Sequence, residues 1–203
     1  MTSSSSFTTL ISVSELQALM DSGRPMMVFD CTFDLAQPSL GGVLYRESHI
    51  PGALHADLDR DLSAKHGAPG AAGTLTATEG DMPASGGRHP LPNRERLATW
   101  LSSIGFANDM QAVVYDRNGA NYCGRLWWML KWAGHDAVAL LDGGLQAWTA
   151  AGKPVASGEE PAHFQSNFAL GEPLRQLVTA ADVQARLGQP GQTIVDARAT
   201  PRY

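Results

Sequence analysis

The stretch VVYDRNGANYCGRLWWMLKW, residues 113–132, decides the fold. A short apolar run ends at Asp116, a polar loop follows, and a strongly apolar segment at 122–132 comes next. A buried strand that passes through a short loop into a helix is the βα unit of a parallel sheet. Apolar side chains occupy nearly all sides of the predicted helix, so we expect it to be buried on more than one face.

Strands and helices alternate in both directions from this unit. Short apolar runs predict strands at 26–29, 112–115 and 137–141. Amphipathic stretches predict helices at 14–22, 93–104 and 145–151. Ser14 is the expected N-cap of the first of these helices, and the Gly- and Pro-rich stretch 64–88 is predicted as a long loop. The pattern predicts an α/β fold, in which helices cover both faces of a parallel sheet.

Composition excludes several classes of protein. The 203 residues include 15 Lys and Arg against 20 Asp and Glu, a net charge of −5, which leaves no basic stripe for a nucleic acid. No apolar run is long enough to cross a bilayer, and the first residues lack the positive charge of a secretory signal. Two cysteines, Cys31 and Cys123, suit a reducing compartment. We therefore expect a cytoplasmic protein without nucleic-acid or membrane partners.

The end of the chain is similar to its beginning. LVTAADVQARLGQPGQTIVDARA at 177–199 repeats the pattern of LISVSELQALMDSGRPMMVFDCT at 10–32, if one single-residue gap is allowed. Asp196 then matches Asp30, and each ends an apolar run. This self-similarity predicts that a second unit of the same kind begins near Leu177. The alternative is chance similarity between two amphipathic segments.

The loop after the central strand is a candidate anion site. It consists of Asp116, Arg117, Asn118, Gly119, Ala120 and Asn121. A tight loop that enters a helix N-terminus aims several backbone N–H groups at one point, at the sheet edge where α/β proteins bind ligands. A cysteine in such a cradle would have a lowered pKa. Asp116 could instead fill the cradle as a built-in anion, which cannot carry sulfur. The alternative is that the loop only connects strand to helix.

These residues resemble a family. VVYDRNGANYCGRLWWMLKWAGHDAVALLDGGLQAWTAAGKPV, with SHIPGA, GRHPLP and IVDARATPRY, is similar to the tandem rhodanese-like sulfurtransferases, which use thiosulfate or 3-mercaptopyruvate. The resemblance implies an open parallel five-stranded sheet with helices on both faces. It divides the chain into a non-catalytic rhodanese-like domain at 8–155, a linker at 156–176 and the truncated start of a second domain at 177–203.

The resemblance also implies an activity. In that family the first domain typically carries Asp where the second carries its catalytic Cys, and Asp116 matches this pattern. The reaction moves a sulfane sulfur through a cysteine persulfide to cyanide or another thiol. We therefore expect a sulfurtransferase fragment, inactive by itself, whose partners are small anionic sulfur compounds and the missing second domain, and which needs no cofactor. The alternatives are a stand-alone inactive domain for protein interaction, and an anion-binding module or sensor at the Asp116 loop.

Few other side chains are candidates for chemistry. His89 and Asp59 match family residues that face the cleft between the domains, where such a pair could assist proton transfer; His89 could instead only hold a loop. Arg202 matches an arginine that binds the anionic donor. Cys123 is the obvious substitute nucleophile, but its apolar neighbours predict a buried structural thiol, as for Cys31. Neither the histidines nor the cysteines have metal-ligand spacing.

Overall fold

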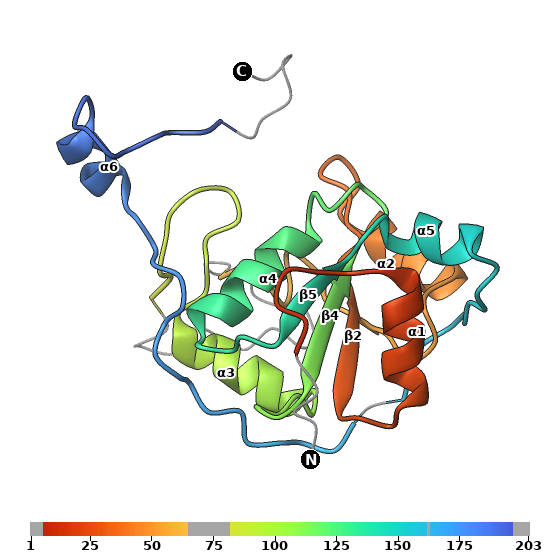
Figure 1. The fold of residues 1–203 in the computed structure, drawn as a ribbon. Coiled ribbons are helices and arrows are strands. Elements are labelled where there is room, and N and C mark those ends of the chain that lie inside the picture. Colours follow the sequence, from red (N-terminus) through yellow and green to blue (C-terminus); the bar gives the residue numbers. More distant parts are fainter. Residues whose placement is uncertain (1–5, 65–81, 162, 197–203) are drawn as a thin grey trace.

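The computed structural model describes residues 6–64, 82–161 and 163–196, and these form the predicted α/β architecture (Figure 1). One sheet of five strands has the order β1-β5-β4-β2-β3, and every pair of neighbours is parallel. The strands are β1 (Leu10–Ile11), β2 (Met26–Asp30), β3 (Leu54–His55), β4 (Gln111–Tyr115) and β5 (Val138–Leu141). The expected five-stranded parallel sheet is confirmed.

Helices cover both faces of the sheet, also as expected. The helices of the described residues are α1 (Val13–Asp21), α2 (Leu40–Glu47), α3 (Arg94–Ser103), α4 (Cys123–Trp132), α5 (Gly144–Ala150) and α6 (Ala180–Arg186), the last of which does not cover the sheet (Figure 1). Helices α3 and α4 lie on one face, and α1 and α5 lie on the other (Figure 1). Because successive strand residues point to opposite faces, β4 places Val114 in one core and Val113 and Tyr115 in the other. Within the described residues, no helix is long and apolar enough to cross a membrane.

The register of the two central strands positions the functional site. Strands β2 and β4 pair along their whole length, from Met26 with Gln111 to Asp30 with Tyr115. The chain therefore leaves both strands at the same edge of the sheet, and the loop that begins at Asp116 starts beside the segment that follows β2. Polar groups from loops far apart in the sequence can meet at this edge.

The first helix begins earlier than the sequence suggested. Ser12, not Ser14, is the N-cap, because its hydroxyl accepts the Glu15 N–H while the Glu15 carboxylate accepts the Ser12 N–H. This reciprocal pair is a capping box, and its Ser-x-x-Glu spacing is visible in the sequence. The choice of Ser14 was wrong, because that residue lies inside the helix and Gln17, three positions further on, donates to Asp21 instead.

Helix α2 was not predicted from the sequence. It contains Gly41 and Gly42, and glycine disfavours helix by about 1 kcal/mol relative to alanine. Gly41 has a packing reason: a Cβ atom there would lie 2.3 Å from the carbonyl oxygen of Thr32, just after β2. The helix can approach the strand end only because this side chain is absent.

The segment predicted as a linker, 156–176, runs along the domain (Figure 1). Its backbone N–H groups donate to carbonyl oxygens of α2, α3 and α4, through Gly158 to Arg46, Ser166 to Ser102 and Leu174 to Lys131. Its Phe168 is buried in the core, where its ring packs against those of Phe106 and His135. The segment thus forms a strap across one side of the domain.

Helix α6 lies apart from the sheet (Figure 1). It has the same kind of N-terminus as α1, a capping box formed by Thr179 and Asp182, but none of its residues is buried. The stretch 192–196, which matches β2 in the repeat, has no strand structure. A strand needs a hydrogen-bonded neighbour, and the described residues place none beside it. Of the predicted loop at 64–88, residues 65–81 lie outside the described residues.

Alanine substitutions at the two glycines of α2 should change the free energy of unfolding in opposite directions. Gly41→Ala should lower the free energy of unfolding by about 1–3 kcal/mol, because the new methyl group meets backbone that cannot yield. Gly42→Ala should raise it by up to about 1 kcal/mol, because the nearest atom there is the flexible Arg46 side chain, 3.4 Å away. Urea denaturation of both variants measures the difference; equal effects would contradict the close approach to Thr32.

The buried His135 predicts a loss of stability in mild acid. Burial lowers its pKa, and its Nε2 lies 3.1 Å from the Ala137 carbonyl oxygen. The unfolded chain therefore takes up the proton first: the stabilisation is complete above the unfolded pKa of about 6.5 and is lost as the pH falls towards the folded value. Urea denaturation between pH 7 and pH 5 should show a shallower pH dependence for His135→Asn than for the parent. Identical slopes would argue against a neutral buried imidazole.

Candidate functional site

The carboxylate of Asp116 fills the cradle formed by its own loop. Its Oδ1 accepts the N–H groups of Asn118 at 2.8 Å and Ala120 at 3.0 Å. Its Oδ2 accepts those of Tyr122 at 2.7 Å and Cys123 at 2.9 Å. The side chain is buried, so these bonds replace the water that a carboxylate would otherwise keep. The loop is therefore a backbone anion site whose anion belongs to the protein.

The loop adopts left-handed backbone to aim these groups inward. Gly119 and Ala120 both have positive φ, 70° and 64°, and Ala120 is the one non-glycine residue with positive φ in the described part of the chain. Successive left-handed residues turn neighbouring N–H groups towards one point, as in other anion-binding nests. An alanine in this region costs roughly 1–2 kcal/mol, which the bonds to Asp116 offset.

Neither cysteine offers a thiolate. Cys123 and Cys31 are both buried and unpaired by a disulfide. Burial raises the pKa of the Cys123 thiol, and the nearby Asp116 carboxylate raises it further. Burial likewise raises the pKa of Cys31 well above its usual range. Both side chains thus have the properties of core residues rather than of nucleophiles.

Beside the cradle lies a hollow of about 380 Å³ at the ends of β1, β4 and β5. Its lining includes Asp116, Gly119, Ala120, Asp142 and Gly144. Gly144 is needed here, because a Cβ atom at this position would lie 2.3 Å from the carbonyl oxygen of Asp116. The β5–α5 turn thus packs directly against the start of the loop and fixes its position.

Arg117 anchors the same loop to α2. Its guanidinium donates to the carbonyl oxygens of Leu44, at 2.8 Å, and Ser48. Residues Asn118, Gly119, Ala120 and Asn121 are exposed. The loop therefore makes its contacts through backbone N–H groups and through the side chains of Asp116 and Arg117.

The structure brings His89 and Asp59 together, although thirty residues separate them in the sequence. The His89 Nε2 lies 3.1 Å from the Asp59 Oδ1, and both side chains are largely buried. The Phe33 ring packs edge-on against the rings of both His89 and Tyr122. Since Tyr122 belongs to the loop that holds Asp116, the His–Asp pair and the cradle lie on the same side of the molecule.

A compact turn holds Asp59. The Asp57 carboxylate accepts the N–H groups of Asp59 and Arg60, and the Asp57 carbonyl accepts those of Asp61 and Leu62. Such local carboxylate-to-backbone bonds are typical of Asx turns. Asp59 is thus fixed on a rigid turn rather than on a mobile loop.

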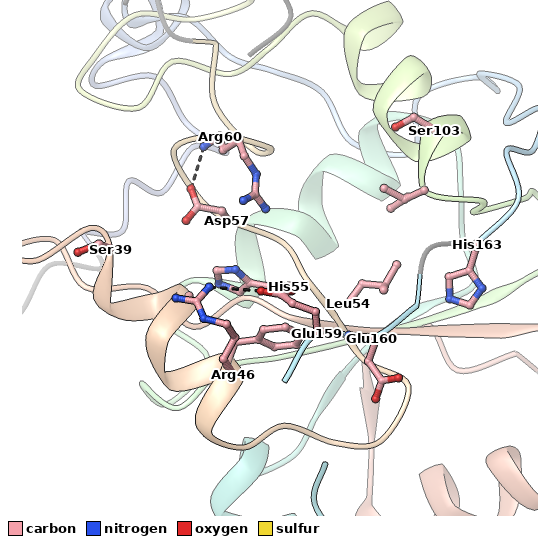
Figure 2. A pocket seen from close by; sticks show the side chains of 13 residues that line it. Ser39, Arg46, Leu54, His55, Asp57, Arg60, Ser103, Glu159, Glu160 and His163 are labelled. Carbon is pink, nitrogen blue, oxygen red and sulfur yellow. Dashed lines mark hydrogen bonds and ion pairs between the residues drawn. The ribbon is translucent and has the colours of Figure 1, made fainter. Parts of the chain in front are cut away.

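A second cavity, of about 450 Å³, was not predicted from the sequence; it lies between α2, β3 and the strap (Figure 2). Figure 2 shows Arg46, His55, Arg60, Glu159 and Glu160 around it, but protein groups already engage both arginines and His55. Arg46 pairs with Glu159 at 3.3 Å, Arg60 pairs with Asp61 at 2.7 Å, and the His55 Nε2 lies 3.1 Å from the Thr32 carbonyl oxygen. Of the predicted site residues that the structure describes, none lines this cavity.

Arg202 lies outside the described residues. Among residues 6–64, 82–161 and 163–196, no group of three or more His, Cys, Asp or Glu side chains is arranged to hold a metal ion.

Fold and site together define a class: an open parallel α/β domain with a backbone-amide anion site at the end of its central strand. The family model of the rhodanese-like domain matches residues 12–151, which include the whole sheet except β1. The chain therefore belongs to the rhodanese-like domain family, as the sequence resemblance indicated.

Curated relatives extend this match. A probable 3-mercaptopyruvate sulfurtransferase of Pseudomonas aeruginosa is 43% identical over 199 residues, which cover 96% of this chain and 63% of that protein. A putative thiosulfate sulfurtransferase of Mycobacterium tuberculosis is 32% identical over 197 residues, which cover 96% of this chain and 62% of that protein. The chain thus spans less than two thirds of the length of these two relatives.

Solved structures share the fold. SseA from Escherichia coli, described as a 3-mercaptopyruvate sulfotransferase with the rhodanese fold, superposes with a TM-score of 0.75 at 24% identity. The match covers 97% of this chain and 68% of that one. At this level of identity the likeness concerns the fold alone.

The cradle makes a prediction about a thiol in place of Asp116. In Asp116→Cys, the introduced sulfur should face the same N–H groups, so its pKa should fall below the usual 8.5 or so. Alkylation by iodoacetamide at pH 7 should then be at least about tenfold faster than for the parent, whose thiols are buried. Asp116→Ser is the matched control, because it lacks the introduced thiol but keeps Cys31 and Cys123. A reaction no faster than that of the parent would contradict the convergence of the amides.

Proposed function

We propose that this chain is the non-catalytic rhodanese-like unit of a sulfurtransferase that takes sulfur from 3-mercaptopyruvate. In that reaction a cysteine thiolate attacks the substrate sulfur, the carbon–sulfur bond breaks, and the carbon leaves with its electron pair and takes up a proton to give pyruvate. The enzyme is left as a persulfide, which passes its sulfur to cyanide or another thiol. In this proposal the nucleophile belongs to a second, cysteine-bearing unit.

The single observation that carries the proposal is the occupied cradle. A carboxylate bound by four backbone N–H groups leaves no place for a persulfide, and it would repel an anionic donor. The same occupancy argues against the alternative of an anion sensor. The 43% identity to a probable 3-mercaptopyruvate sulfurtransferase favours that donor over thiosulfate.

The proposed contribution of this unit to the chemistry is the pair of His89 and Asp59. An imidazole held by a carboxylate can carry a proton to the carbon that leaves as pyruvate, and the carboxylate fixes its orientation and tautomer. The pair is held at 3.1 Å, and the Phe33 ring connects His89 to Tyr122 at the start of α4.

The proposed partner of the domain is the rest of a second unit, to which residues 177–203 belong. The apolar side chains of Val178, Leu187, Ile194 and Val195 are exposed, although an equivalent pattern in α1 and β2 is mostly buried. Further strands and helices would cover them. Free, buried cysteines suit the reducing conditions of the cytoplasm, where we place the protein.

Two assays test the proposal. The chain by itself should release no pyruvate from 3-mercaptopyruvate and form no thiocyanate from thiosulfate and cyanide. Fusion to the part of the Pseudomonas aeruginosa relative that this chain does not match should give turnover of 3-mercaptopyruvate. In the fusion, His89→Gln should lower kcat by about 10²–10⁴-fold, the usual worth of a general acid or base.

His55→Gln in the same fusion is the matched control, because this partly buried histidine bonds to the Thr32 carbonyl oxygen and lines the other cavity. Turnover by the chain alone that disappears in Cys123→Ser would overturn the non-catalytic assignment. A fusion that is active and insensitive to His89→Gln would remove the proton-transfer role but not the family reaction.

A further inference from the structure

Arg125 projects from the first turn of α4 into the region of the His–Asp pair. Its Nε and Nη2 donate to the Leu62 carbonyl oxygen at 3.0 and 2.8 Å. Its Nη2 also lies 3.0 Å from the carbonyl oxygen of His89 and 3.2 Å from that of Pro90. One planar group therefore bonds to two segments that are distant in the sequence.

This cation is held without a carboxylate. In the described part of the chain its acceptors are these carbonyl oxygens and the hydroxyl of Ser63, 3.4 Å away. Burial lowers the pKa of Arg125 to about 10. Taking a charge out of water is costly unless its hydrogen bonds are replaced. We therefore read a buried guanidinium with neutral acceptors as a group that holds those carbonyl groups in place.

The carbonyl groups that Arg125 binds belong to the backbone segments that hold Asp59 and His89. Leu62 closes the turn that carries Asp59, since its N–H donates to the Asp57 carbonyl oxygen. The carbonyl of His89 is part of the catalytic candidate itself. A displacement of either segment relative to the other must therefore stretch a bond to Arg125.

We propose that Arg125 is a positioning residue that sets the His89–Asp59 geometry by clamping the backbone beneath both. This assignment rests on the proposed function, because it names the group that holds the proposed proton-transfer pair. Lysine cannot replace it: an ammonium is a point donor, whereas the clamp needs a planar fork that reaches several carbonyls at fixed angles.

The test is a double-mutant cycle of the pair in three backgrounds. His89→Gln, Asp59→Asn and their combination are made in the parent chain, in Arg125→Lys and in Arg117→Lys, and unfolding in urea is measured at pH 7. Arg117 is the matched control, since its guanidinium also binds backbone carbonyls but on the α2 side. A merely structural role of Arg125 would lower stability without changing the coupling within the pair.

In the parent and in Arg117→Lys, the coupling should change the unfolding equilibrium constant by about threefold to tenfold. In Arg125→Lys it should fall below twofold. An undiminished coupling in Arg125→Lys would overturn the proposal, as would an equal loss in Arg117→Lys or no coupling in the parent. The cycle needs no turnover, so its failure would leave the sulfurtransferase proposal standing, and the failure of that proposal would leave the clamp testable.

A second measurement covers the case in which Arg125→Lys does not fold. In the folded parent chain, the clamp requires slow rotation of the Arg125 guanidinium and protection of its protons from solvent. Separate, slowly exchanging ¹⁵N–¹H signals for its Nη2 group are the expected NMR result. A single averaged signal with fast exchange, as for a guanidinium free in water, would refute the clamp.

Discussion

The convergence of four backbone N–H groups on the Asp116 carboxylate ties the central strand to the helix that follows it. The first N–H groups of a helix have no partners within the helix, and a buried helix start must find them elsewhere. Here Asp116, the residue after β4, accepts the N–H of Cys123, the first residue of α4, and that of Tyr122 before it. The direction of α4 is thereby fixed to the strand, and every side chain that α4 carries inherits this position.

The same interaction gives the loop a structural role and removes it from the chemistry. An empty cradle of this kind would stabilise an incoming anion or a thiolate; a filled one stabilises the fold instead. The carboxylate also acts on its surroundings, because it helps to keep the Cys123 thiol protonated. What remains available for chemistry is the neighbouring pair of His89 and Asp59, which is held by separate contacts.

The sequence predicts those parts of the molecule whose signals are local. The strand at 112–115, the helix at 122–132 and the loop between them follow from apolar runs and turn residues, and both cores lie where these runs place them. Strands β1 and β3 have two residues each, too short for any periodicity. Helix α2 is hidden by Gly41, whose role depends on contact with Thr32. The contacts of Arg125 cannot be predicted from the sequence either, because its acceptors are backbone carbonyls, which every residue type has.

Two arginines, Arg117 in the loop and Arg125 just after it, bind parts of the chain that do not belong to the sheet. Arg117 binds carbonyls at the end of α2, and Arg125 binds those of the turn after β3 and of the segment before α3. Neutral acceptors suit this purpose, since a carboxylate partner would concentrate the interaction on one flexible side chain, whereas several carbonyls divide it among fixed points of the backbone. The edge of the sheet that holds the candidate site is thus built outward from one strand–helix junction, which also carries the core residue Cys123.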